Sequence, residues 1–120
     1  ANLSLLYSDT LQQPDRALVI AERARSQKPR SPKVLDALGW SYYQTGKVAR
    51  GEDFVKQSLR RGETVEAYLH LAQIVMNRSA FEEALGHLRM AEELAQDPYS
   101  LNRIKVLQDD IRKTQVSVDD

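Results

Sequence analysis

The side chains of this chain that could transfer protons or hold a metal are two histidines and two pairs of glutamates. His70 and His87 are expected on different helices, and neither is part of the HExxH pattern that binds zinc. Glu82-Glu83 and Glu92-Glu93 are sequence neighbours, which point about 100° apart on a helix, so neither pair forms an acid/base dyad. The sequence also has no cysteine, no glycine-rich phosphate loop and no nucleophile elbow. We therefore expect no enzyme activity, no metal and no cofactor.

Helices are expected to position these side chains, because apolar residues recur along the chain at the spacing of one helical face. Leu35, Leu38 and Tyr42 are one example, and no segment alternates with period two for long enough to be a strand. Ser31 and Asp97 each precede a proline, which is typical of an N-cap followed by Pro in the first helical turn. We predict seven helices, over about residues 1–11, 14–28, 32–45, 48–61, 65–77, 80–95 and 98–114, and a flexible tail at 116–120.

The composition predicts one soluble domain. No apolar run approaches the roughly 18 residues of a membrane span, and no signal peptide is visible, so we expect no membrane insertion. The absence of cysteine does not choose between cytoplasm and periplasm. The formal net charge is zero, which disfavours nucleic-acid binding. Basic residues are in excess in 1–62 and acidic residues in 63–120, which indicates either a solvated surface with chance asymmetry or head-to-tail self-association.

The predicted helices fall into an internal repeat with a period near 34 residues. Three segments open alike, as Leu3-Ser4-x-x-Tyr7, Leu38-Gly39-x-x-Tyr42 and Leu71-Ala72-x-x-Val75. A second landmark follows each of them, as Ala17 with Ala24, Gly51 with Ser58 and Ala84 with Ala91. Small residues at these positions allow paired helices to approach closely, and the large residues beside them fill the space between layers. One pair cannot bury its apolar face alone, so the pairs must stack.

This pattern resembles the tetratricopeptide repeat (TPR) family, whose repeat opens with W-x2-L-G-x2-Y. The stretch Leu35-x2-Leu38-Gly39-x2-Tyr42 matches the opening with Leu for Trp, and Phe81-x2-Ala84-x3-Leu88 matches the second half. The run Leu38–Tyr43 is similar to bacterial members. The resemblance implies an all-α fold, a right-handed α-α superhelix, in a single domain over 1–115. It would contain three helix pairs, at about 1–31, 32–64 and 65–97, and a C-terminal capping helix at 98–114.

Three features depart from a complete, regular repeat. Gly51 stands in a helix interior, where it costs about 1 kcal/mol relative to Ala, so we expect the helix over 48–61 to be the least stable. The first predicted helix is short by about one turn, so we expect the chain to be the C-terminal portion of a longer repeat array. The helix over 98–114 has Lys105 where a repeat needs a small residue, so we expect it to end the stack as a solubilising cap.

The resemblance also implies a concave groove lined by the first helix of each pair. Trp40 and Tyr43 lie on a different face from Tyr42, which falls on the core stripe. A partly exposed Trp with Tyr, Leu and Met is typical of a peptide-binding surface. The alternative is that a neighbouring repeat or the capping helix covers these side chains. The expected groove residues are Lys33, Asp36, Trp40, Tyr43, Gln44, Leu69, Gln73, Met76 and Asn77, with Glu66 beside them and Leu5, Ser8 and Asp9 before them.

We therefore expect a non-catalytic interaction or scaffold module that binds a peptide or a partner protein in this groove, with Trp40 and Tyr43 as aromatic anchors. Two alternatives remain open. The chain is a spacer or self-assembling structural segment, or it is the non-catalytic TPR arm of a larger enzyme. The sequence does not identify the partner or the pathway.

Overall fold

The fold is taken from a computed structural model, which describes the backbone of residues 2–119 and the side chains of residues 15–117. Within that range the chain forms helices and short connections and contains no strand, so the predicted all-α class is confirmed. The elements are α1 (Asn2–Gln27), α2 (Pro32–Gln44), α3 (Val48–Arg61), α4 (Val65–Val75), the short 3-10 helix η1 (Met76–Arg78), α5 (Phe81–Leu94) and α6 (Pro98–Asp119).

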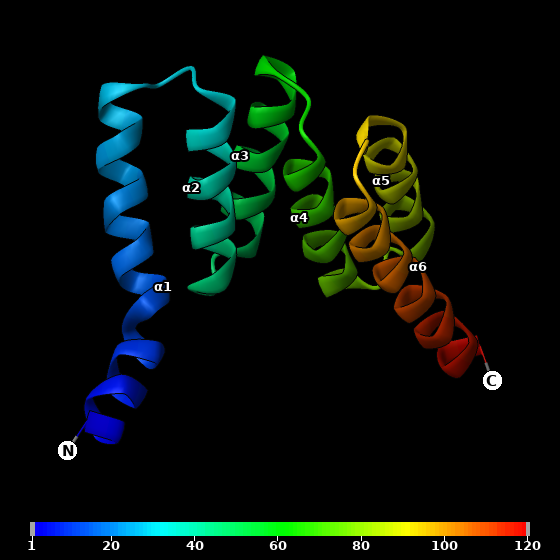
Figure 1. The fold of residues 1–120 in the computed structure, drawn as a ribbon, viewed down its shortest axis with the longest axis horizontal. Coiled ribbons are helices and arrows are strands. Elements are labelled where there is room, and N and C mark those ends of the chain that lie inside the picture. The colour runs from blue at the N-terminus through cyan, green and yellow to red at the C-terminus, as the bar shows by residue number, and fades with distance from the viewer. Residues whose placement is uncertain (1, 120) are drawn as a thin grey trace.

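The N-terminal helix differs from the sequence prediction. Separate helices are predicted over 1–11 and 14–28, but the structure has one helix, α1, from Asn2 to Gln27 (Figure 1). The predicted break is wrong because Pro14 removes one backbone donor, which kinks a helix but does not have to end it. No glycine lies near Pro14 to turn the chain back. The first expected helix pair is therefore not a hairpin in this structure.

The other helix boundaries follow the predicted signals. Ser31 caps α2, because its hydroxyl accepts a hydrogen bond of 3.3 Å from the Val34 backbone nitrogen. Asp97 holds the first turn of α6, where its carboxylate accepts from the Ser100 nitrogen at 2.8 Å. Gly46 turns the chain between α2 and α3 with a φ of +93°, a conformation that favours glycine. At the other end α6 continues to Asp119, so it includes most of the segment predicted as a flexible tail.

The helices stand side by side in chain order, from α1 at one end of the molecule to α5 and α6 at the other (Figure 1). Their short connections make consecutive helices antiparallel neighbours. α2 packs on α3, α4 packs on α5, and α2 also contacts α4 directly. α2, α4 and α6 share one face of the molecule, because Trp40 of α2 stacks on His70 of α4, and Glu66 of α4 pairs with Arg103 of α6.

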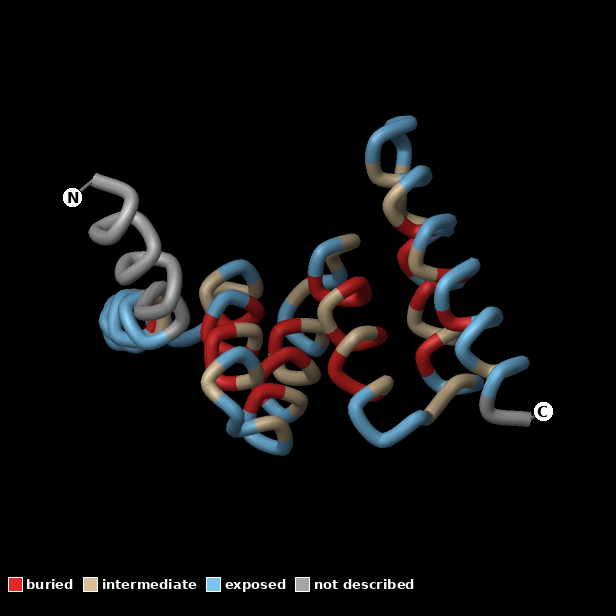
Figure 2. The backbone as a smooth tube through the Cα atoms, turned by 90° about the horizontal axis from the view of Figure 1, so that it is seen from below, coloured by how far each residue is buried: buried red, intermediate tan, exposed pale blue. Residues whose placement is uncertain are grey.

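The core follows the facing sides of α2 to α6, whereas the described part of α1 is mostly exposed (Figure 2). α4 lies at its centre and is the most apolar helix, with both of its sides buried between neighbours. On α6 the buried positions are Ile104, Gln108 and Ile111, while Leu101 is exposed. Burial on one face only is what a helix at the end of a stack requires.

Two glycines set the distance between α2 and α3. A methyl group built on Gly51 would lie 2.6 Å from the Gly39 carbonyl oxygen and 2.9 Å from the Tyr43 nitrogen. A methyl group on Gly39 would lie 2.7 Å from the Gly51 carbonyl oxygen. All three distances are shorter than carbon can approach backbone atoms, so this helix contact needs glycine on both sides. Gly51 therefore has a packing role that its low helix propensity does not reveal.

Candidate functional site

The predicted groove residues lie on α2, on α4 and in η1, and most of them keep exposed surface. Lys33, Gln44 and Asn77 are exposed, and Trp40, Tyr43, Gln73 and Met76 are half-buried. Leu69 is fully buried in the core and cannot contact a partner from that position. Asp36 is also buried. The side chains of Leu5, Ser8 and Asp9, which were expected in the same groove, lie outside the described residues.

Trp40 and Tyr43 lie against each other on the face that α2 shares with α4. Their ring centroids are 5.1 Å apart, with 30° between the ring planes. The other partner of Trp40 is His70 of α4, whose ring stacks on the indole at 4.2 Å and 16°. Such aromatic stacking fixes ring orientation and contributes beyond the buried area alone. The indole is therefore held in place by α4 while part of it stays open to solvent.

A chain of polar contacts links α2, α4 and α6 beneath this aromatic pair. The buried carboxylate of Asp36 lies 2.8 Å from His70 Nδ1, and His70 Nε2 lies 4.0 Å from Glu66. Glu66 then makes a two-pronged ion pair with Arg103 of α6. The hydrogen bond from Arg103 holds the pKa of Glu66 below its usual value. These contacts fix the relative positions of the three helices that form the shared face.

The aspartate–histidine pair on this face has the first two members of a catalytic triad but lacks the third. The ring nitrogen of His70 that does not contact Asp36 faces Glu66, and no serine or threonine of the described segment hydrogen-bonds to it. A triad needs a hydroxyl or thiol nucleophile at that nitrogen. We therefore interpret the pair as a positioning contact between α2 and α4.

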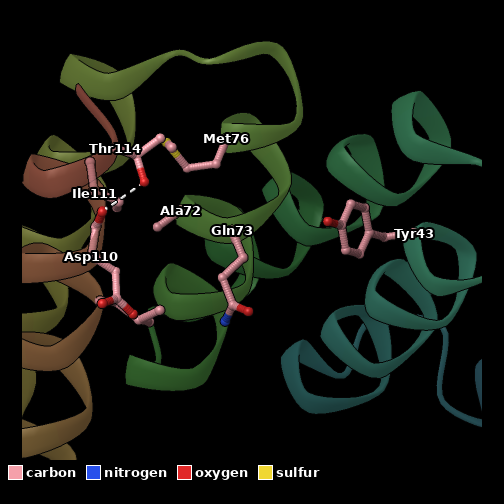
Figure 3. A pocket seen from close by; sticks show the side chains of 8 residues that line it. Tyr43, Ala72, Gln73, Met76, Asp110, Ile111 and Thr114 are labelled. Atoms are coloured by element: carbon pink, nitrogen blue, oxygen red, sulfur yellow. Dashed lines mark hydrogen bonds between the residues drawn. The ribbon is translucent and has the colours of Figure 1, made fainter. Parts of the chain in front are cut away.

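A hollow of about 260 Å³ opens between α2, α4 and α6 (Figure 3). Ala72, Gln73 and Met76 come from the α4 side, and Tyr43 approaches from α2. α6 closes the other side, where the Thr114 hydroxyl donates to the Asp110 carbonyl oxygen at 2.9 Å. The lining is Tyr43, Ala72, Gln73, Met76, Leu107, Asp110, Ile111 and Thr114. Apolar walls with a few polar groups are typical of a site that binds a side chain.

A second hollow, of about 470 Å³, lies on the other side of Trp40. Its walls come from α1, α2 and α4 and are mainly apolar, with charged groups at the rim. Trp40 and Tyr43 thus stand between two concave regions on one face of the molecule. The lining residues are Ala17, Lys33, Asp36, Ala37, Trp40, Ser41, Gln44, Thr64, Glu66 and His70.

Sequence reasoning missed the contribution of α6 and of His70 to this face. His70 was considered only as a candidate for metal binding or proton transfer, although it lies one repeat after Ala37 and contacts Asp36 of α2 in the structure. Leu107, Asp110, Ile111 and Thr114 share one side of α6 at helical spacing, which was a usable signal. Within the described residues no three potential ligands are grouped to hold a metal, and no helix has the length and apolar character that crossing a membrane requires.

No protein-family model matches the chain. A 51-residue region, 42% of the chain, is 35% identical to the TPR repeat-containing protein PA4667 of Pseudomonas aeruginosa. The chain spans 9% of the length of that protein. The similarity and the all-helical fold together support a TPR-like family, and such repeats act in general as protein-interaction modules.

Proposed function

We propose that the chain is a non-catalytic module that binds a peptide or partner protein along the face formed by α2, α4 and α6. The observation that carries this proposal is the half-buried pair Trp40–Tyr43, which stands between two mainly apolar hollows. Interface energy concentrates in such aromatic residues, because they bury a large area with few rotatable bonds. Lys33, Gln44 and Asn77 are exposed polar residues around this centre. A polar rim of this kind gives specificity more than affinity.

We also propose that the helices belong to a right-handed TPR superhelix, with α2/α3 and α4/α5 as the repeats over 32–64 and 65–97 and α6 as the cap. Support comes from small residues at equivalent positions one period apart. Gly39 meets Gly51 in one pair, and Ala72 and Ala84 occupy the matching positions of the next pair, both fully buried. In such a superhelix the first helices of successive pairs line the concave side, so the proposal assigns α2, α4 and α6 to that side.

The test begins with peptides selected from a random display library on the 120-residue chain, whose affinities are then measured by fluorescence polarisation. Trp40→Ala should weaken binding by about 2 kcal/mol, or roughly 30-fold, which is typical of an aromatic anchor. Met90→Ala is the matched control, because Met90 is an exposed apolar residue on α5, away from this face. The Met90→Ala variant should bind the selected peptides with the same affinity as the unmodified chain.

A second variant separates lost contact from lost folding. Gln44→Arg introduces a bulky charge at an exposed position that lines the larger hollow, so it should weaken peptide binding without disturbing the core. Circular dichroism of each variant verifies that helicity is retained. Unchanged affinity in both Trp40→Ala and Gln44→Arg, with helicity intact, would remove this face as the binding site.

A second form of the proposal places the same module within a longer protein. The matched region is a small part of a TPR repeat-containing protein, which favours the interpretation of this chain as one arm of a larger assembly. In that case the face described above would contact another domain of the same protein. Binding of a separately expressed partner domain, measured with and without Trp40→Ala, distinguishes an internal contact from capture of an external peptide.

A further inference from the structure

The surface between α1 and α2 contains an apolar slot that none of the described side chains fills. Its volume is about 410 Å³, and its walls carry almost no polar surface. Ile20 projects from this wall with 66% of its surface exposed, unusually high for a large aliphatic residue. The walls include Ala17, Ile20, Ala21 and Ala24 of α1 and Val34 and Ala37 of α2.

The equivalent slot in the next repeat of the chain is filled. By the repeat spacing, Ile20 corresponds to Phe54 of α3, and Ala37 corresponds to His70 of α4. There α2 itself lies in the slot, and its Tyr42 ring stacks on Phe54 at 5.4 Å. Phe54 is consequently only 9% exposed, against 66% for Ile20. The empty slot therefore has the position in the repeat and the apolar lining of a site for one helix that resembles α2.

The sequence contains a segment that matches this missing helix. Leu3-Ser4-x-x-Tyr7 repeats the Leu38-Gly39-x-x-Tyr42 pattern with which α2 contacts α3. Ser4 is small enough to pack against Ala17 in the way that Gly39 packs against Gly51. Tyr7 would stand opposite Ile20, as Tyr42 stands opposite Phe54. Residues 3–11 thus complement the slot in both size and apolar pattern.

The segment between residues 11 and 14 determines whether that helix can come from the same chain or has to come from a second copy of it. The two tight turns inside the other pairs each use a left-handed residue, Gly46 with φ +93° and Ser79 with φ 56°. The corresponding segment, Leu11-Gln12-Gln13, contains no glycine, asparagine or aspartate, the residues that adopt this conformation most readily. A tight turn back to the slot of the same chain is therefore disfavoured, and α1 instead continues as one helix through this segment.

We propose that residues 3–11 of a second copy of this chain occupy the slot between α1 and α2, and that the exchange is reciprocal. An isologous exchange fills both slots with one two-fold axis and leaves no further copy to recruit. The slot adjoins the proposed partner-binding face, because it shares part of its lining with the larger hollow: Ala17, Lys33, Ala37 and Ser41. The two proposals are tested separately, since the exchange is measured by mass and cross-linking and the peptide site by affinity. The exchange also differs from charge-driven association, because the slot is apolar and the resulting dimer should survive high salt.

The absence of cysteine makes a direct test possible, because any introduced cysteine is unique. Tyr7→Cys and Ile20→Cys chains, carrying different tags, are unfolded together, refolded as a mixture and treated with a short bis-maleimide. A cross-link between the two tags is expected, and a Tyr7→Cys chain mixed with Lys105→Cys, exposed on α6, should give none. In the double variant Tyr7→Cys/Ile20→Cys, a cross-link confined to one chain would show folding back and overturn the proposal. No cross-link in any sample would overturn it as well.

Light scattering provides the independent measurement. The unmodified chain should have twice its 13.7 kDa mass at both low and high salt. Ile20→Lys should give a helical monomer, whereas Val19→Lys should remain dimeric, because Val19 is exposed on the same helix but does not line the slot. Gln12→Gly should shift the dimer towards a folded-back monomer. A monomeric unmodified chain, or a dimer that Ile20→Lys leaves intact, would refute the exchange.

Discussion

Replacement of Gly51 by alanine tests how the two helices of a pair are held together. Helix propensity alone predicts that Gly51→Ala stabilises the chain by about 1 kcal/mol, since Gly51 lies inside α3. The structure predicts the opposite sign. The new methyl group would meet the Gly39 carbonyl oxygen at 2.6 Å, the Tyr43 nitrogen at 2.9 Å and the Tyr43 Cβ at 3.0 Å. These atoms belong to the backbone of α2 or are attached to it, so they cannot move without shifting the whole helix.

The expected magnitude is the balance of these two effects. Overpacking of a close contact typically costs about 1–3 kcal/mol, and the propensity gain offsets about 1 kcal/mol of that cost. We therefore expect Gly51→Ala to lower the free energy of unfolding by up to about 2 kcal/mol. Gly86 provides the matched control, because it also lies inside a helix but its added methyl group would meet only Arg89, at 3.9 Å. Gly86→Ala should raise the free energy of unfolding by about 1 kcal/mol.

The assay is urea denaturation followed by the helical circular dichroism signal, with all three proteins measured at one concentration. The two variants should move the midpoint in opposite directions, with a difference of about 1–3 kcal/mol in the free energy of unfolding between them. Gly39→Ala should behave like Gly51→Ala, because its methyl group would lie 2.7 Å from the Gly51 carbonyl oxygen. If Gly51→Ala stabilises the chain as much as Gly86→Ala does, the close backbone contact between α2 and α3 is refuted.

Three further predictions follow from buried polar groups. Burial lowers the pKa of His87, whose Nε2 is buried without a hydrogen-bond partner, so the unfolded state binds the proton more tightly. Stability should therefore fall as the pH drops below the unfolded value of about 6.5, and His87→Phe should flatten this dependence in urea denaturation at several pH values. Asp36→Ala and His70→Ala should each destabilise the chain by about 1–3 kcal/mol, and a double-mutant cycle should show coupling through their 2.8 Å contact. Ser58→Ala should cost about 1 kcal/mol in thermal unfolding, because its hydroxyl donates to the Pro32 carbonyl oxygen at 2.6 Å.

The proposed partner-binding face could be predicted from the sequence only in part. The helical spacing placed Trp40, Tyr43 and Gln73 on faces that the structure shows as half-buried. It also placed Leu69 there, although that residue is in the core. The error has a physical reason: α4 lies between neighbours and is apolar on most of its surface, so its pattern does not reveal which side is open. The helical spacing on α6 groups its lining residues on one side of that helix, but only the docking of the last helix places that side against α4.

The sequence by itself determined the all-α class, the repeat of about 34 residues and the limits of α2 to α5, because caps, turns and apolar spacing act locally. Only the tertiary structure decided that residues 2–27 form one helix, that two glycines set the spacing of α2 and α3, and that Trp40 rests on His70. Each of these depends on what a residue meets across space. A proline permits either a kink or a break, and a glycine in a helix is a weak point or a required contact, according to the element packed against it.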